Sequence, residues 1–474
     1  MPSHSIRVAV AAALLATPCF SQILPGHSIA TVAPSGQPGE MYDIDHQAGT
    51  ASQLTISAAL AAAIPNCVLM TNPVTGYVGT NAAPTGDIYA ISVASGVVSE
   101  TLLNTTPTAG GNVAQLAVLG NKLYFCTQTA GVLGSLQSVP TAGGPVTLEL
   151  DIATLSATGL ANACAVIGTK VFVATFNSSP ANTATSPGEL IEFDTVTLTG
   201  RIVLNLPPGG FAPVGNPWNT GIVNMVEDPM APGILVLQGV YGDLLRIDPA
   251  LGTVVSSTWT GLLNAGGNAL ASGTVNSFSF DPVAQDWVVG TRYAAIERWV
   301  GDQQAENKIL GVGTHPTLTS NSITGIQYFP EVGGVDTSYG GGCAGNDGWK
   351  PTDSSFGAPL AGNTAFRLGL FSANPGDLAV LLIDFQNAVI GSIPLPADLG
   401  TYGAPNCFIR TGNLISTFVV TSGTGSGGGQ AFVSMPLPSW AVGLNFYRQW
   451  AELQLLPTNG LGLVVSNARH VVVQ

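Results

Sequence analysis

The sequence predicts an all-β protein, a six-bladed β-propeller closed by its N-terminal strands and followed by a C-terminal β-sandwich. Three observations lead to this fold class. Only 8% of the 474 residues are charged and 46% are apolar. The 59 Gly and 32 Pro residues separate many short apolar runs, which is typical of strands joined by turns. A short phrase recurs through residues 28–333, and the recurrence stops near Ser338.

The first 21 residues are predicted to be a secretory signal peptide. Arg7 supplies a positive charge, "VAVAAALLAT" follows as a short apolar core, and "CFS" places small residues before Gln22. A lipoprotein signal with Cys19 as the lipidated residue is the alternative, and Pro18 directly before that Cys argues against it. No later stretch has the uninterrupted apolar length of a membrane-spanning helix. We therefore expect an exported protein that is periplasmic, cell-surface or extracellular.

The recurring phrase combines Gly, an apolar stretch, an acidic residue and a turn, as in "GEMYDIDHQAGT" and "GDLLRIDPALGT". Its copies begin at intervals of 47 to 54 residues, at Gly39, Gly86, Gly134, Gly188, Gly242 and Ala294. A period of this length in β-type sequence indicates a propeller with one four-stranded blade per repeat. Each phrase is predicted to hold the third strand, its turn and the start of the fourth.

The two ends of the repeat region complement each other. "ITGIQYFP" at 323–330 supplies an inner strand without partners, whereas the N-terminal segment supplies three strands without an inner one. We expect the N-terminal strands to pair beside the segment near residue 326. This pairing would complete the sixth blade, and closure removes exposed sheet edges.

The repeat pattern of the sequence ends near residue 338. "SYGGGCAGNDG" forms a Gly-rich joint, and seven or so short alternating strands follow as far as residue 474. Such a series predicts a β-sandwich. The predicted boundaries are therefore a signal peptide at 1–21, a propeller at 28–333 and a sandwich at 338–474.

Two resemblances accompany these predictions. The repeats of 28–333 resemble the NHL, YVTN and lactonase-like propellers of exported bacterial proteins. The succession of "YGGGC", "GAPNC" and "GGGQAFVSMPLPSWAVGLNFYRQWAEL" resembles a C-terminal module of large exported proteins from environmental bacteria. The second resemblance implies an exported modular protein and places Cys343 and Cys407 in the paired positions of that module. It implies no enzymatic activity.

Charge and cysteine content narrow the possible partners. A formal net charge of −14 and the lack of any Lys/Arg run disfavour nucleic acid. Cys343 and Cys407 lie in Gly-rich turns and are a candidate disulfide in an oxidising compartment. Cys67, Cys126 and Cys164 lie in apolar strand runs and are expected to be buried free thiols. No zinc-site spacing occurs, and no metal or cofactor is predicted.

The mouth of the central channel is the predicted ligand site. Polar side chains recur near the start of each inner strand, namely Asn66, Gln115, Asn162, Asn224, Asn276 and Thr324. A ring of amides suits a small polar ligand or a hard cation. The alternative is that these groups satisfy the strand ends, because their positions counted from the following turn differ by one or two residues.

The sequence leaves three functions open. No convergent catalytic set occurs, which favours a non-enzymatic binding or scaffold protein for a small molecule, a glycan or a protein. A channel-mouth hydrolase or lyase is the first alternative, with Glu227, Asp228 and Asp281 as candidate carboxylates, although Asp-Pro is ordinary turn chemistry. A cell-envelope structural or attachment protein is the second. The sequence does not predict an oligomeric state.

Overall fold

The computed structural model describes residues 22–474 apart from a set of internal gaps. The predicted signal peptide at 1–21 therefore lies outside the described residues. The gaps are 35, 82–85, 130–131, 157–159, 177–187, 207–221, 240–242, 260–274, 292–295, 301–306, 311–321, 331–332, 345–349, 424–426 and 456–458.

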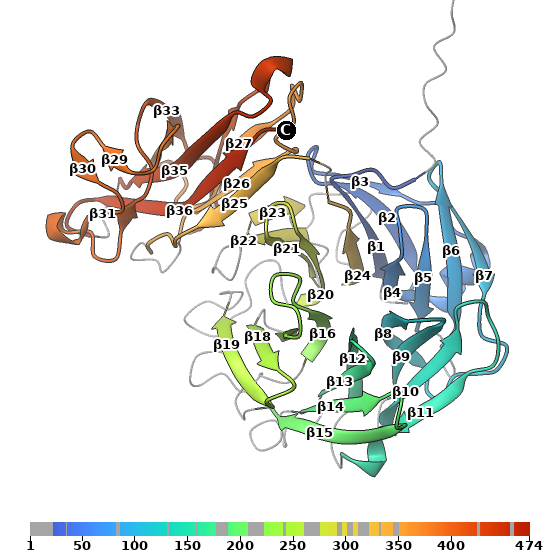
Figure 1. The fold of residues 1–474 in the computed structure, drawn as a ribbon. Coiled ribbons are helices and arrows are strands. Elements are labelled where there is room, and N and C mark those ends of the chain that lie inside the picture. Colours follow the sequence, from blue (N-terminus) through green and yellow to red (C-terminus); the bar gives the residue numbers. More distant parts are fainter. Residues whose placement is uncertain are drawn as a thin grey trace, which may run out of the picture.

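Six four-stranded antiparallel sheets among the described residues are arranged around a common centre, as in a β-propeller (Figure 1). From the centre outward, the first sheet contains β24 (Ser322–Tyr328), β1 (His27–Ala33), β2 (Glu40–Asp45) and β3 (Thr50–Gln53). The second contains β4 (Pro65–Met70), β5 (Thr75–Thr80), β6 (Ile88–Ala94) and β7 (Val97–Leu102). The third contains β8 (Asn112–Leu119), β9 (Lys122–Thr129), β10 (Val132–Pro140) and β11 (Thr147–Asp151).

The other three sheets follow in chain order. The fourth contains β12 (Leu160–Ile167), β13 (Lys170–Phe176), β14 (Glu189–Asp194) and β15 (Thr199–Asn205). The fifth contains β16 (Ile222–Glu227), β17 (Leu235–Gly239), β18 (Asp243–Asp248) and β19 (Thr253–Trp259). The sixth contains β20 (Val275–Asp281), β21 (Asp286–Thr291), β22 (Ile296–Val300) and β23 (Asn307–Leu310). The all-β class is confirmed, and the six-bladed count of the complete chain stays a prediction.

The ends of the repeat region share one sheet, as predicted. β1 pairs antiparallel with β24, and Ala30 lies opposite Ile326. Since these residues are nearly 300 positions apart in the chain, this ladder ties the start of the ring to its end. Each inner strand also contacts the next inner strand around the centre, and β20 contacts β24.

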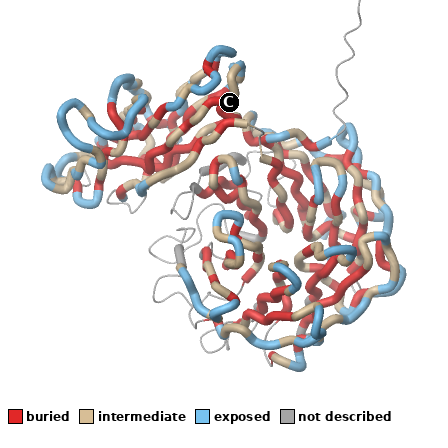
Figure 2. The backbone as a smooth tube through the Cα atoms, in the orientation of Figure 1, coloured by how far each residue is buried: buried red, intermediate tan, exposed pale blue. Residues whose placement is uncertain are grey.

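Apolar clusters hold neighbouring sheets together. One such cluster lies between each consecutive pair of sheets, including the pair formed by the sixth sheet and the first. Figure 2 shows the inner strands mostly buried and the outer strands more exposed. Burial of apolar area contributes about 25 cal/mol per Å², so these clusters account for most of the stabilisation of the ring.

The Asp residue of the recurring phrase forms the turn between the third and fourth strands. In the first sheet, Oδ1 of Asp45 accepts hydrogen bonds from the backbone N–H groups of Gln47 and Ala48, both at 2.8 Å. Asp194 and Asp248 accept the corresponding pairs in the fourth and fifth sheets. A short carboxylate side chain is suited to this turn because it reaches its own backbone two residues on. In these three sheets the Asp of the phrase is therefore a turn residue.

One helix was not predicted. α1 (Ala58–Ala63) joins the first and second sheets. The hydroxyl of Ser57 accepts a hydrogen bond from Leu60 N, which caps the helix, and the Ala-rich stretch has high helix propensity. A six-residue helix has too short a periodic pattern to be recognised among strands.

Two further sheets form the C-terminal part. The larger has the order β25 (Val335–Tyr339), β36 (Leu463–Val472), β35 (Asn445–Leu453), β28 (Leu378–Asp384) and β33 (Ile415–Val420). The smaller has the order β26 (Thr352–Phe356), β27 (Arg367–Ala373) and β34 (Gly429–Ser434). The C-terminal part also contains the short elements β29 (Val389–Ile390), β30 (Ile393–Pro394), β31 (Ala397–Asp398), β32 (Phe408–Ile409), η2 (Gly400–Tyr402) and η3 (Ser439–Ala441). The short helix η1 (Ile152–Thr154) belongs to the ring.

The two C-terminal sheets enclose one apolar core. Leu368 and Leu370 of β27 pack in the same cluster as Leu381 of β28 and Trp450 of β35. The first strand, β25, begins at Val335, between the predicted end of the propeller at residue 333 and the predicted start of the sandwich at residue 338. The predicted disulfide is present, because Cys343 and Cys407 are bonded. No helix among the described residues is long and apolar enough to cross a membrane.

Candidate functional site

A pocket of about 420 Å³ lies at the centre of the ring. Five of the six inner strands line it, namely β4, β8, β16, β20 and β24. Its size falls within the usual range of small-molecule sites. The predicted site residues Gln115, Asn224 and Thr324 all line this pocket.

Every inner strand carries one β-bulge, and the bulges explain the register of the predicted polar ring. In β4, Pro65 pairs with Thr80 and Cys67 with Gly79, which leaves Asn66 as the extra residue. The same comparison in the other sheets assigns the extra residues, here called bulge positions, as Asn66, Ala114, Asn162, Val223, Asn276 and Thr324. Gln115 and Asn224 therefore lie one residue after their bulge positions. Bulges re-aim side chains, and simple strand alternation cannot predict where these residues point.

Polar bulge positions fasten neighbouring inner strands to each other. Nδ2 of Asn66 donates to Val113 O at 2.9 Å and to Oδ1 of Asn112 at 2.8 Å. Nδ2 of Asn162 donates to Ile222 O at 2.8 Å. In each case one acceptor is the backbone carbonyl of the residue just before the bulge of the next sheet, namely Val113 or Ile222. These amides are therefore clasps between sheets.

Thr324 repeats this contact where the ring closes. Its hydroxyl lies 3.4 Å from Pro65 O on β4 and 3.3 Å from Thr31 O on β1. Thr324 thus links the closing sheet to the second sheet. The backbone of Asn276 lies in β20, but its side chain is outside the described part of the structure.

Gln115 is a structural bridge across three inner strands. Its Oε1 accepts from Met225 N at 3.1 Å and from Cys164 N at 3.2 Å, and its Nε2 donates to Met225 O at 2.7 Å. The side chain therefore runs from β8 to β16 in contact with β12, the inner strand that does not line the pocket. Because its amide is occupied, Gln115 offers little hydrogen bonding to a ligand.

Three other side chains keep donors available at the pocket. Oδ1 of Asn224 accepts from Met225 N at 2.8 Å, while its Nδ2 bonds to no described residue. Oε1 of Gln327 accepts from Met70 N at 3.1 Å, and Oγ of Ser279 accepts from Tyr328 N at 3.0 Å. The Gln327 amide N–H₂ and the Ser279 O–H are therefore left to donate. Phe278 and Phe280 provide apolar wall beside them.

The described residues that line the pocket include no Asp, Glu, Lys, Arg or His. The candidate carboxylates lie in turns instead. Asp228 accepts from Met230 N and pairs with Arg246 at 2.7 Å, and Asp281 accepts from Val283 N and pairs with Arg298 at 2.6 Å. Within the described ranges, no three His, Cys, Asp or Glu side chains are placed to hold a metal ion.

The remaining thiols are buried between the sheets, as predicted. Cys67 donates to Val113 O, Cys126 to Ala163 O and Cys164 to Gln115 O, each on a neighbouring sheet. Burial raises the pKa of Cys67 and of Cys126 well above the usual thiol value. Such thiols are protonated and unreactive.

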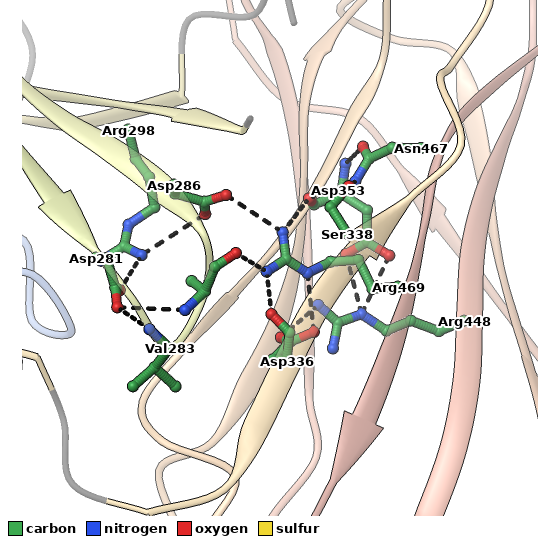
Figure 3. A network of polar contacts seen from close by, with 11 residues as sticks. Asp281, Val283, Asp286, Arg298, Asp336, Ser338, Asp353, Arg448, Asn467 and Arg469 are labelled. Atoms are coloured by element: carbon green, nitrogen blue, oxygen red, sulfur yellow. Dashed lines mark hydrogen bonds and ion pairs between the residues drawn. The ribbon is translucent and has the colours of Figure 1, made fainter. Parts of the chain in front are cut away.

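A second polar feature joins the ring to the C-terminal sheets (Figure 3). It consists of three buried arginines and four buried aspartates, here called the interface network, with members Asp281, Asp286, Arg298, Asp336, Asp353, Arg448 and Arg469. Within the C-terminal part, Arg469 binds Asp336 at 2.8 Å, and Arg448 binds Asp336 and Asp353, each at 3.0 Å. No sequence pattern indicated this network, since its members are scattered over nearly 190 residues.

The interface network has one more carboxylate than it has guanidinium groups. Burial raises the pKa of Asp286 to about 6, and Arg469 and Arg298 only partly oppose this. Burial likewise raises the pKa of Asp353 to about 7 despite Arg448. Burial also opposes ionisation of Asp336, but Arg448 and Arg469 outweigh it and lower its pKa to about 2. The raised pKa values favour the protonated forms of Asp286 and Asp353, which reduces the excess of negative charge in the network.

Comparisons with known proteins give no family. No protein-family model matches the chain. No curated protein matches it. Several solved structures resemble it, among them TolB from Acinetobacter baumannii, with 12% identity, a TM-score of 0.40, and coverage of 64% of this chain and 67% of that one. A Bacteroides thetaiotaomicron protein of unknown function has 14% identity, a TM-score of 0.39, and coverage of 66% and 79%. Chaetomium thermophilum Sqt1, bound to the N-terminus of ribosomal protein L10, has 14% identity, a TM-score of 0.34, and coverage of 65% and 75%.

Proposed function

We propose that this chain is an exported, non-enzymatic binding protein whose central pocket holds an uncharged, oxygen-rich small molecule such as a neutral sugar. In this proposal residues 1–21 direct export and residues 28–333 form a six-bladed propeller of the NHL, YVTN or lactonase-like type. The observation that carries it is the chemistry of the pocket. Its hydrogen-bonding groups include the donors of Asn224, Ser279 and Gln327, and apolar residues such as Phe278 and Phe280 lie beside them.

The lack of charge in the pocket selects the ligand class. A buried charge needs a partner of opposite sign, and the described lining residues provide none. The net charge of −14 also repels anions at long range. Hydroxyl and carbonyl oxygens, by contrast, accept hydrogen bonds from amides without any charge. The same lining makes the hydrolase alternative less favourable, because the only titratable side chains among the described lining residues are Tyr328 and the buried thiol Cys67, whereas general acid–base chemistry most often uses His, Asp or Glu.

Thermal unfolding of residues 22–474 in the presence of neutral sugars tests the proposal. A ligand that binds only the folded state raises the melting temperature in proportion to RT ln(1 + [L]/Kd). We expect a saturable rise with at least one neutral mono- or oligosaccharide and none with the matching sugar acid. A library of neutral sugars that leaves the melting temperature unchanged would refute a sugar ligand.

A single substitution that changes one functional group in the pocket tests whether the ligand binds there. Asn224→Asp replaces a free donor by a carboxylate and should weaken binding about tenfold or more, since a buried hydrogen bond is lost and a charge is added. Asn121→Asp makes the same chemical change at an exposed turn and serves as the control. Equal binding by the two variants would place the ligand outside the central pocket.

A further inference from the structure

Strand β33 is an open edge of the larger C-terminal sheet. Its only strand partner among the described residues is β28, with Val380 opposite Phe418 and Leu378 opposite Val420. In an antiparallel pair every second residue directs its N–H and C=O away from the partner. β33 therefore presents a row of unpaired backbone donors and acceptors on its outer side.

The two edges of the C-terminal sheets have different surroundings. β25 and β26 are edge strands on the side of the ring, where β26 contacts β22 and Asp336 joins the interface network. β33 and β34 are the opposite edge strands, and Ser422 forms a bridge with Gln430 between them. Figure 1 shows β33 on the side of the C-terminal sheets that faces away from the ring. The ring therefore leaves β33 itself uncovered, while the chain just after it, at Ser422, is bonded to β34.

The usual protection of an edge strand is missing here. Natural proteins place Lys, Pro, a bulge or an inward charge on exposed edges to prevent pairing with another chain. Residues 411–447 contain no Asp, Glu, Lys, Arg or His, and the register of β33 with β28 is continuous over Ile415–Val420. β33 itself has the sequence ISTFVV, which is rich in β-branched and aromatic residues.

Exposed apolar side chains lie on β33 and on strands next to it in the sheet. Phe418 is 62% exposed and Val420 is 63% exposed. Val420, Leu378 and Leu453 form one row across three adjacent strands, and Leu453 is also exposed. A further strand beside β33 would extend this row and bury part of its apolar area.

The distribution of charge favours a second copy of this chain as that other strand. Residues 338–474 carry five Lys/Arg and six Asp/Glu, whereas residues 1–337 carry eight and 21. Two copies that meet through their C-terminal sheets thus keep the acidic rings apart. An antiparallel pairing of β33 with itself is two-fold symmetric, so the same uncharged side chains meet from both copies.

We propose that β33 pairs antiparallel with β33 of a second copy, which joins the two larger C-terminal sheets into one continuous sheet. Backbone hydrogen bonds provide the attraction, and Phe418 and Val420 of each copy cover those of the other. This inference does not depend on the pocket or on its ligand.

The mass of residues 22–474 in solution, measured by sedimentation over a wide range of concentrations, tests the proposal. We expect a concentration-dependent dimer. Phe418→Lys combined with Val420→Lys brings four positive charges together at the two-fold axis and should weaken dimerisation about tenfold or more, because like charges facing each other across strands repel. A wild-type chain that stays monomeric throughout would overturn the proposal, and the strand would then be open to a different partner.

Two further variants separate the edge from general surface effects. Trp440→Lys combined with Val442→Lys makes the same charge change at residues that are 78% and 67% exposed but lie outside β33, and it should dimerise as wild type does. Phe418→Lys mixed with Phe418→Glu should dimerise more tightly than either variant alone, because opposite charges then face each other across the two strands, and this recovery also shows that both variants fold. If the β33 and control variants dimerise equally, the contact lies elsewhere and the proposal fails.

Discussion

Arg469 in β36 lies 3.7 Å from the carboxylate of Asp286 in β21, and both side chains are completely buried. Arg469 also donates to Ala284 O at 3.1 Å, so a cation from the C-terminal sheets is held by two groups of the ring. A second arginine of the C-terminal sheets also binds the ring, because Arg367 donates a hydrogen bond to Gln47 O. The last strand of the chain is thereby fixed to the sixth sheet.

Removal of the Arg469 charge should destabilise the protein strongly. Arg469→Met leaves Asp286 and Asp336 buried with fewer cations, and loss of one partner from a buried ion pair costs about 3–5 kcal/mol. Urea unfolding measures the change. Arg201→Met removes an exposed guanidinium from Glu192, which keeps its ion pair with Lys170, and should cost less than about 1 kcal/mol. A similar small cost for Arg469→Met would show that the network does not stabilise the fold.

The same network should make stability depend on pH. An unfolded Asp titrates at about pH 3.9, whereas Asp286 and Asp353 keep their protons up to about pH 6 and 7 in the folded protein. The stabilisation that results is fully present below the unfolded pKa and is lost as the pH rises through these folded values. The contribution of Asp336 has the opposite sign, but it is lost only as the pH falls towards 2.

We therefore expect the free energy of unfolding to decrease between pH 5 and pH 8. Each carboxyl that is protonated in the folded protein and ionises on unfolding contributes up to about 1.4 kcal/mol per pH unit to this decrease. Asp286→Asn removes one titrating group without changing its shape and should flatten this slope. Glu100→Gln on the outer strand β7 should leave the slope unchanged. A stability that is constant or rises over this range would contradict the raised pKa values of Asp286 and Asp353.

The clasp between the second and third sheets can be removed by Asn66→Ala. This substitution leaves Oδ1 of Asn112 without its donor among the described residues and leaves Val113 O with the weaker S–H donor of Cys67, and an unsatisfied buried polar group costs about 1–3 kcal/mol. Chemical denaturation of the variant measures the cost, and Asn121→Ala at an exposed turn is the matched control. An unchanged stability with loss of sugar binding would instead favour a ligand role for Asn66.

The disulfide closes a loop of 64 residues. In the chain-entropy model its removal by Cys343→Ser with Cys407→Ser destabilises the protein by about 4 kcal/mol. The unfolding midpoint in urea should fall to the same value when wild type is treated with a reductant. The double variant should not respond to reductant, and any response would implicate Cys67, Cys126 or Cys164.

Several features of the candidate site could be predicted from the sequence. Polar residues at Asn66, Asn162 and Thr324 were placed at the start of inner strands, and the structure finds them there at bulge positions. Their contacts could not be predicted, because each clasp depends on a carbonyl of the next sheet. Gln115 shows this most clearly, since its main partner, Met225, lies 110 residues later. The available donors of Asn224, Gln327 and Ser279 also depend on the tertiary structure, because each side chain uses its oxygen to accept from a backbone N–H.

By itself the sequence determined the strand period, the turn after each third strand and the shared closing sheet, because each follows from residue types at a fixed spacing within one repeat or from matching ends. The Gly-rich surroundings of Cys343 and Cys407 also indicated the disulfide. Only the tertiary structure decided which side chains line the central pocket, which of them fasten sheet to sheet, and how buried charges join the ring to the C-terminal sheets. The physical reason is that hydrogen bonds and ion pairs in the interior depend on distances of a few ångströms between residues far apart in the chain. A repeat determines where a strand runs, and its neighbours determine what its side chains meet.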